Sequence, residues 1–166
     1  MPTNFDPFHH HLISIIPAIY RYQQKPPHTP STNMAIPVVV YSNMALAGNN
    51  LTKTLQPEYE VIKVVLDKTE AVADLPALFS SGAAKALVVA GLLAGEDADA
   101  DEVEAAVTAA QPGVRVARLS RADLEGAGIQ LLPPGASTEK GFQPEGAPRP
   151  DPAIFPRLFK AKLAGI

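Results

Sequence analysis

The side chains best suited to hold a ligand follow an apolar run near the start of the middle region. Val38–Tyr41 is continuously apolar, and Ser42, Asn43, Gly48 and Asn49 come after it. Hydroxyl and amide groups beside the free N–H groups of a helix start can hold an anion. The sequence therefore predicts a site for a small anionic ligand at this turn.

The same stretch resembles a known phosphate-binding turn. Residues 38–51, VVVYSNMALAGNNL, resemble the opening of flavodoxins, where a strand ending in Tyr-Ser or Tyr-Gly leads into a hydroxyl-rich loop. The resemblance implies an FMN-like ligand at the turn. In this chain Met44, Ala45 and Leu46 stand where the family has the hydroxyls that bind the FMN phosphate. Neither G-x-G-x-x-G nor G-x-x-x-x-G-K-[ST] occurs in the sequence, and no cofactor is identified.

The distribution of histidine and cysteine excludes several chemistries. All four histidines lie within residues 1–33, and the chain has no cysteine. Residues 34–166 therefore cannot form a Ser-His-Asp or Cys-His nucleophile system or a histidine-ligated zinc site. Carboxylate, lysine, tyrosine or cofactor chemistry remains open there. We identify no catalytic residue and no metal ligand in this region, and the residue types favour, without deciding, a protein that is not an enzyme.

Apolar periodicity predicts the elements that position the turn. Strands are expected at 36–41, 59–66, 86–90, 114–119 and 129–132, with helices between them. Thr69 or Asp74 is expected to cap the second helix, Asp99 with Glu102 the third, and Ser120 a short fourth. The connections are long enough for crossover helices, which join parallel strands. We predict an α/β fold, a three-layer doubly wound, mostly parallel sheet of four to five strands with helices on both faces.

The order of the strands stays open between two alternatives. In the flavodoxin order, strands one and three are neighbours, and residues 90–97 with Gly91 share the ligand crevice with Ser42 and Asn43. In the Rossmann order the fourth strand lies there instead and brings Arg121, a candidate phosphate partner. The candidate ligand-binding residues are Ser42, Asn43, Gly48, Asn49, Gly91 and Arg121.

Proline is concentrated at the two ends of the chain. Residues 1–33 hold six of the 17 prolines and residues 133–166 hold seven. We expect a disordered leader at 1–33, a Rossmann-like α/β domain at 34–132, a Pro/Gly-rich loop at 133–150, and a C-terminal helix at 151–166 that packs on the domain. Asp151 and Pro152 are expected to begin this helix, unless it begins at Pro156.

Two functions remain for such a domain. The missing glycine fingerprint and the absence of histidine and cysteine from residues 34–166 favour a non-catalytic interaction or degenerate binding module, with self-association as one mode. The alternative is a protein that binds a nucleotide or another anionic small molecule, NAD(P)-like or FMN-like, at the turn after the first strand. A formal charge of −3 gives no reason to expect nucleic acid, and no apolar run reaches the ~18 residues of a membrane span. The lack of cysteine fits a cytoplasmic location.

Overall fold

The computed structural model describes residues 34–134, 136 and 143–166. The predicted leader, residues 1–33, lies outside the described residues. The strands are β1 (Ile36–Ser42), β2 (Tyr59–Val65), β3 (Ala86–Ala90) and β4 (Arg115–Arg118). The helices are α1 (Ala45–Thr54), α2 (Lys68–Ser80), α3 (Ala98–Ala110), α4 (Arg121–Gly126) and α5 (Ile154–Leu163).

The four strands form one sheet in which every neighbouring pair is parallel. Their order is β2-β1-β3-β4, so β1 and β3 lie side by side at the centre. The prediction of an α/β fold with a parallel sheet is confirmed. The strand order is the flavodoxin alternative, and the Rossmann order is wrong for this chain, because β1 pairs with β3 and not with β4.

The fifth strand predicted at 129–132 is wrong. These residues have no strand structure, although Ile129 is buried in the core. The chain turns at Gly128, whose φ is +79°, and the N–H of Ile129 donates to the carbonyl of Leu124 at the end of α4. The backbone is therefore anchored to α4 rather than paired with β4, and the apolar pattern reflects burial alone.

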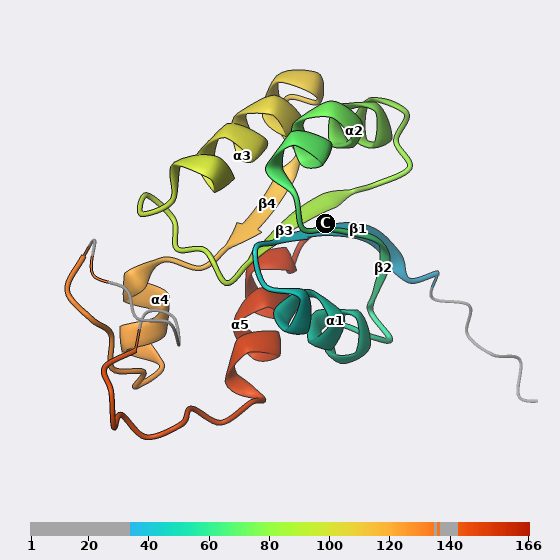
Figure 1. The fold of residues 1–166 in the computed structure, drawn as a ribbon. Helices are drawn as coiled ribbons and strands as arrows, with labels where there is room; N and C mark the ends of the chain where they lie inside the picture. Colours follow the sequence, from blue (N-terminus) through green and yellow to red (C-terminus); the bar gives the residue numbers. More distant parts are fainter. Residues whose placement is uncertain (1–33, 135, 137–142) are drawn as a thin grey trace, which may run out of the picture. The chain divides into compact units, whose positions relative to one another are not determined.

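The side chains of β1 point alternately to two separate clusters. Val38 and Val40 belong to one hydrophobic cluster, whereas Val39 and Tyr41 belong to the other. Figure 1 shows α2 and α3 on one side of the sheet and α1 and α5 on the other. We call these the α2–α3 side and the α1–α5 side.

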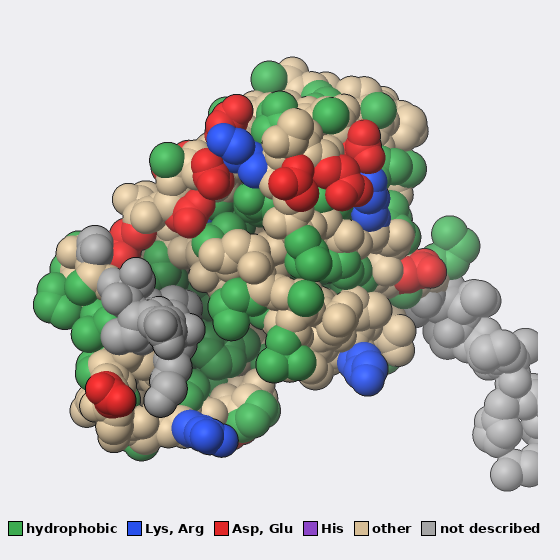
Figure 2. Space-filling view, in the orientation of Figure 1, with side chains coloured by type: hydrophobic (Ala, Val, Ile, Leu, Met, Phe, Trp, Pro, Cys, Tyr) green, Lys and Arg blue, Asp and Glu red, His purple; other side chains and the backbone are tan. Residues whose placement is uncertain are grey.

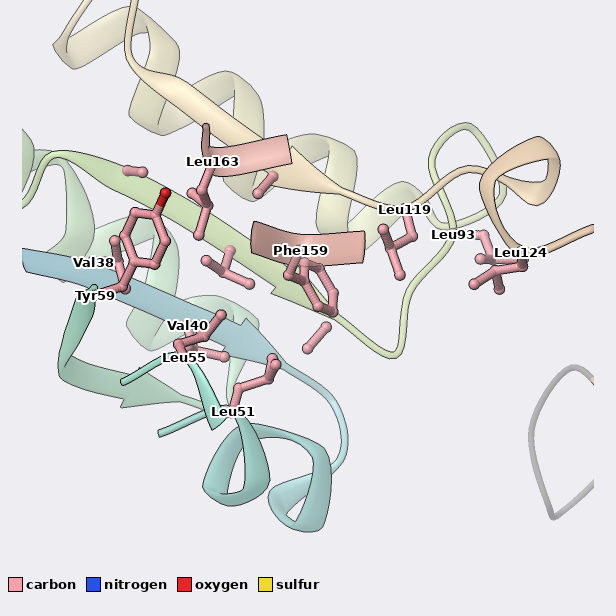
Figure 3. Close-up of a cluster of buried hydrophobic side chains, with 14 of the residues drawn as sticks. Val38, Val40, Leu51, Leu55, Tyr59, Leu93, Leu119, Leu124, Phe159 and Leu163 are labelled. Atoms are coloured by element: carbon pink, nitrogen blue, oxygen red, sulfur yellow. The ribbon is translucent and has the colours of Figure 1, made fainter. Parts of the chain in front are cut away.

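Each side is filled by the apolar stripes of its helices. On the α2–α3 side, Leu75 and Phe79 of α2 and Val103 of α3 are at most 1% exposed. On the α1–α5 side, Phe159 and Leu163 of α5 lie in one buried cluster with Val40 of β1, and α5 packs on β4. Figure 3 shows this cluster. The C-terminal helix thus contributes directly to the core of the sheet domain.

The helix starts differ in part from the sequence predictions. The carboxylates of Asp67 and Asp97 cap α2 and α3, so both caps lie earlier in the chain than predicted. Ser120 caps α4, as predicted, within a capping box that Asp123 completes. In α5, Pro156 lies in the first turn, where its missing N–H group costs no helical hydrogen bond.

Candidate binding cavity

The carboxyl ends of β1 and β3 bring part of the predicted site together. Gly91, the first residue after β3, has a φ of +79° and lies beside the turn that follows β1. A Cβ atom at Gly91 would lie 3.4 Å from both Asn43 Oδ1 and Met44 Sδ. Gly91 and Asn43 are therefore neighbours, as the flavodoxin strand order predicts.

Ser42 satisfies its hydroxyl group within its own turn. The side chain is fully buried, and its Oγ donates to the carbonyl of Met44 and accepts from the N–H of Met44, both at 3.1 Å. Because the local backbone already uses this hydroxyl, Ser42 fixes the turn between β1 and α1. Asn43 and Asn49 are exposed, and neither lines the cavity described below.

Gly48 and Arg121 also have structural partners. A Cβ atom at Gly48 would lie 2.7 Å from Val64 Cγ1, so the missing side chain lets α1 approach β2 closely. Arg121 donates to both carboxylate oxygens of Glu96 at 2.8 Å and to the carbonyl of Leu132 at 2.6 Å. Hydrogen bonding to Glu96 raises the pKa of Arg121. Ligand binding by either residue stays a prediction.

A cavity of about 600 Å³ lies beyond the carboxyl ends of β1 and β3, on the α1–α5 side. Its volume falls within the roughly 300–1,000 Å³ of typical ligand pockets. Of the predicted site residues that the structure describes, Gly91 is the one that lines it. Figure 2 shows a hollow between α1 and α4 whose visible wall consists mainly of hydrophobic side chains.

The cavity walls come from several parts of the chain, among them Leu119 and Leu124 at β4 and α4. The first turn of α1 contributes Met44 and Leu46, and the segment after β3 contributes Leu92 and Leu93. The opposite wall is made by α5 and the proline-containing segment before it, including Phe155. Nearly all of these side chains are apolar, whereas the sequence predicted polar groups for a ligand at this turn. That a ligand binds here stays a prediction.

The rim of the cavity leaves large apolar side chains in water. Met44 is 46% exposed and Leu46 is 70% exposed, although both line the cavity. Met44 also occupies the N-cap position of α1, where it makes no side-chain hydrogen bond. An apolar residue at the N-cap stabilises a helix poorly, so Met44 adds little to the stability of α1 from this position.

Arg118 holds the wall that follows β3. Its guanidinium donates to the carbonyls of Leu92, Leu93 and Asp97, and its side chain is only 4% exposed. It also pairs with the carboxylates of Asp101 and Glu104 on α3. Arg118 therefore connects the cavity wall to the α2–α3 side. The sequence showed Arg118 only as one residue of an alternating strand.

The polar groups that line the cavity are few. Among the described residues they are Asn50, Thr54, Gln143 and Arg149, and Arg149 is the one titratable side chain. The hydroxyl of Thr54 already donates to the carbonyl of Asn50 at 2.9 Å. Among the same residues, no group of three or more acidic or histidine side chains is placed to hold a metal ion. The described lining thus provides binding surface but no acid–base pair.

Comparison with known proteins adds no relative. The chain matches no family model, no curated protein and no solved structure. None of the helices in the described part of the chain is both long and apolar enough to cross a membrane. The geometry and chemistry of the cavity are therefore the basis on which we infer a function.

Proposed function

We propose that this chain is a non-catalytic binding module that holds a small, predominantly apolar molecule in the cavity. The observation that carries this proposal is the exposed apolar rim formed by Met44 and Leu46 over an apolar cavity of ligand size. Fully burying a Leu or Met side chain contributes roughly 1.5–3 kcal/mol, so a ligand that covers these residues gains appreciable free energy.

The wall chemistry favours an apolar molecule over a nucleotide. A nucleotide phosphate needs several hydrogen-bond donors or cations around it. The described lining has one cation, Arg149, and the hydroxyl of Ser42 is engaged in its own turn. NAD(P)-like or FMN-like binding at the turn remains the alternative, and self-association and a cytoplasmic location remain predictions from the sequence.

The test is titration of the full chain with the neutral apolar dye Nile red, followed by its fluorescence. We expect saturable binding at one site and displacement by decanol. Ala47→Phe places a ring in the cavity from α1 and is expected to abolish this binding. Ala45→Phe is the matched control, because Ala45 is exposed on the same helix and does not line the cavity.

Two results would contradict the proposal. One is Nile red fluorescence that never saturates, and the other is equal binding by the Ala47→Phe and Ala45→Phe variants. A parallel thermal-shift panel with NAD, FMN, ATP and phosphate tests the alternative. A rise of several degrees with one of these compounds, together with no effect of decanol, would favour a nucleotide-type ligand instead.

A further inference from the structure

Arg149 differs from the other arginines near the cavity in its partners. Arg118 and Arg121 are both engaged in ion pairs with carboxylates. Arg149 lines the cavity and is exposed, and no carboxylate of the described residues lies within 4.0 Å of its guanidinium. Its five N–H donors are therefore available to a ligand as far as the described residues are concerned.

The charge of the cavity lining is opposite to the charge of the chain. The chain has a formal charge of −3, yet none of the described residues that line the cavity carries a carboxylate. Glu145 and Asp151 belong to the same segment as Arg149 but are not part of the lining, and Asp151 accepts the N–H of Ala153. Figure 2 shows acidic side chains mainly over α2 and α3, away from the hollow.

We infer that the ligand is amphipathic, with an apolar body in the cavity and a single anionic head group held by Arg149. This inference rests on the proposed function, because it adds a head group to the same apolar site. A guanidinium donates two parallel hydrogen bonds to a carboxylate or a phosphate, which fixes the head group at one end. Because no carboxylate lines the described part of the site, the anion meets no like charge there.

The experiment compares decanoate with decanol on the full chain by isothermal titration calorimetry. The two probes share an alkyl chain and differ in the head group. An ion pair in a solvent-exposed setting is worth up to ~1 kcal/mol, so decanoate should bind about fivefold more tightly than decanol. Arg149→Gln should remove this preference, whereas Arg149→Lys should keep part of it.

Arg157→Gln is the matched control. Arg157 is exposed on α5, does not line the cavity and is unpaired among the described residues. The Arg157→Gln substitution removes the same net charge as Arg149→Gln. In this variant the protein should still bind decanoate more tightly than decanol. A parallel titration with decyl phosphate tells which anion Arg149 holds more tightly, and tighter binding of either anion than of decanol supports the inference.

The outcomes separate the two proposals. Equal binding of decanol and decanoate, unaffected by Arg149→Gln, overturns the anionic head group but leaves the apolar site standing. A loss of the decanoate preference in Arg157→Gln as large as in Arg149→Gln overturns it too, because net charge then accounts for the effect. Failure of every probe to bind overturns the proposed function itself.

Discussion

The two sides of the sheet are covered by helices that begin in different ways. On the α2–α3 side, the carboxylates of Asp67 and Asp97 cap the two helices. On the α1–α5 side, Ser120 caps the short α4, but Met44 and Ala153, the N-caps of α1 and α5, make no side-chain hydrogen bond. A side-chain cap contributes ~1 kcal/mol to stability. The two helix starts that lack one both border the cavity.

The helix contacts differ in the same way. Lys68 of α2 pairs with Asp99 and Glu102 of α3, both at 3.0 Å, and so joins the two helices of the α2–α3 side directly. Between α1 and α5 the structure has the cavity instead. One side is therefore held together by direct contacts between its helices, whereas the other lacks such packing at the carboxyl ends of β1 and β3.

The largest expected effect compares a phenylalanine on each side. Phe79 of α2 is 1% exposed in the core, and Phe159 of α5 is 3% exposed but lines the cavity. We expect Phe79→Ala to lower the free energy of unfolding by about 4 kcal/mol. Phe159→Ala should cost about 1 kcal/mol less, because one side of that ring already faces empty space. Urea unfolding measures the free energy of unfolding of both variants. An equal or larger loss in Phe159→Ala would contradict the difference between the two sides.

The next effect tests the residue that connects the two sides. Arg118→Met leaves the carbonyls of Leu92 and Leu93 without their donor in a buried setting, and we expect a loss of about 3 kcal/mol. Arg115→Met is the control on the same strand, because Arg115 is exposed and donates to the carbonyl of Ala164. It should cost less than about 1 kcal/mol. Similar urea midpoints for the two variants would contradict the assigned role of Arg118.

A smaller effect tests how closely α1 approaches the sheet. Gly48→Ala gains up to ~1 kcal/mol of helix propensity but forces a methyl group against Val64, which typically costs 1–3 kcal/mol, so we expect a net loss of about 1 kcal/mol. At Gly126 of α4 a Cβ would meet nothing within 4 Å, and Gly126→Ala should be stabilising. Thermal unfolding gives both signs, and the same sign at the two glycines would contradict the close approach.

The smallest expected effect is a pH dependence on the α1–α5 side. Burial acts to raise the pKa of Asp123, but hydrogen bonds from Lys162 and Ser120 outweigh it and lower the pKa to about 2. Since the unfolded value is near 4, the ionised carboxylate stabilises the fold fully above pH ~4 and loses this contribution as the pH falls towards 2. Allowing for solvent screening, we expect about 1 kcal/mol.

Asp123→Asn should therefore be less stable than the unmodified chain at neutral pH, and the difference should vanish by pH ~2. Asp74→Asn serves as the control, because Asp74 is exposed and pairs with Lys63 on the α2–α3 side. A stability difference for Asp123→Asn that is independent of pH would show that the carboxylate charge is not what matters. Urea unfolding across the pH range supplies the measurement.

The parallel sheet could be predicted because local patterns specify it. Val38–Val40 and Leu87–Val89 are continuously apolar, which is typical of strands that are buried on both faces of a sheet. The connections between the strands are too long for hairpins and therefore predict parallel neighbours. The strand order could not be predicted, because it depends on which edge each strand joins. The caps were missed because several acidic residues near each helix start satisfy the same pattern, and only geometry selects Asp67 and Asp97.

The place of the cavity follows from the topology, but the chemistry of its wall could not be predicted. The turn after β1 lies at the carboxyl end of a central strand in either strand order, so its position follows from topology. The cavity wall that faces this turn comes from Phe155 and its neighbours, more than 100 residues later in the chain. No local sequence pattern predicts that these two segments lie close together. The one available signal was that Met44 and Leu46 stand where flavodoxins have phosphate-binding hydroxyls.

The most direct test of the comparison is a backbone-amide NMR titration of the full chain with decanol. We expect saturable chemical-shift changes at the cavity residues, including Leu46, Leu93 and Phe155. The amide signals of Ala71 and Val103 on the α2–α3 side should stay unchanged. Changes centred on α2 and α3, or no saturable change at Leu46 and Leu93, would contradict it.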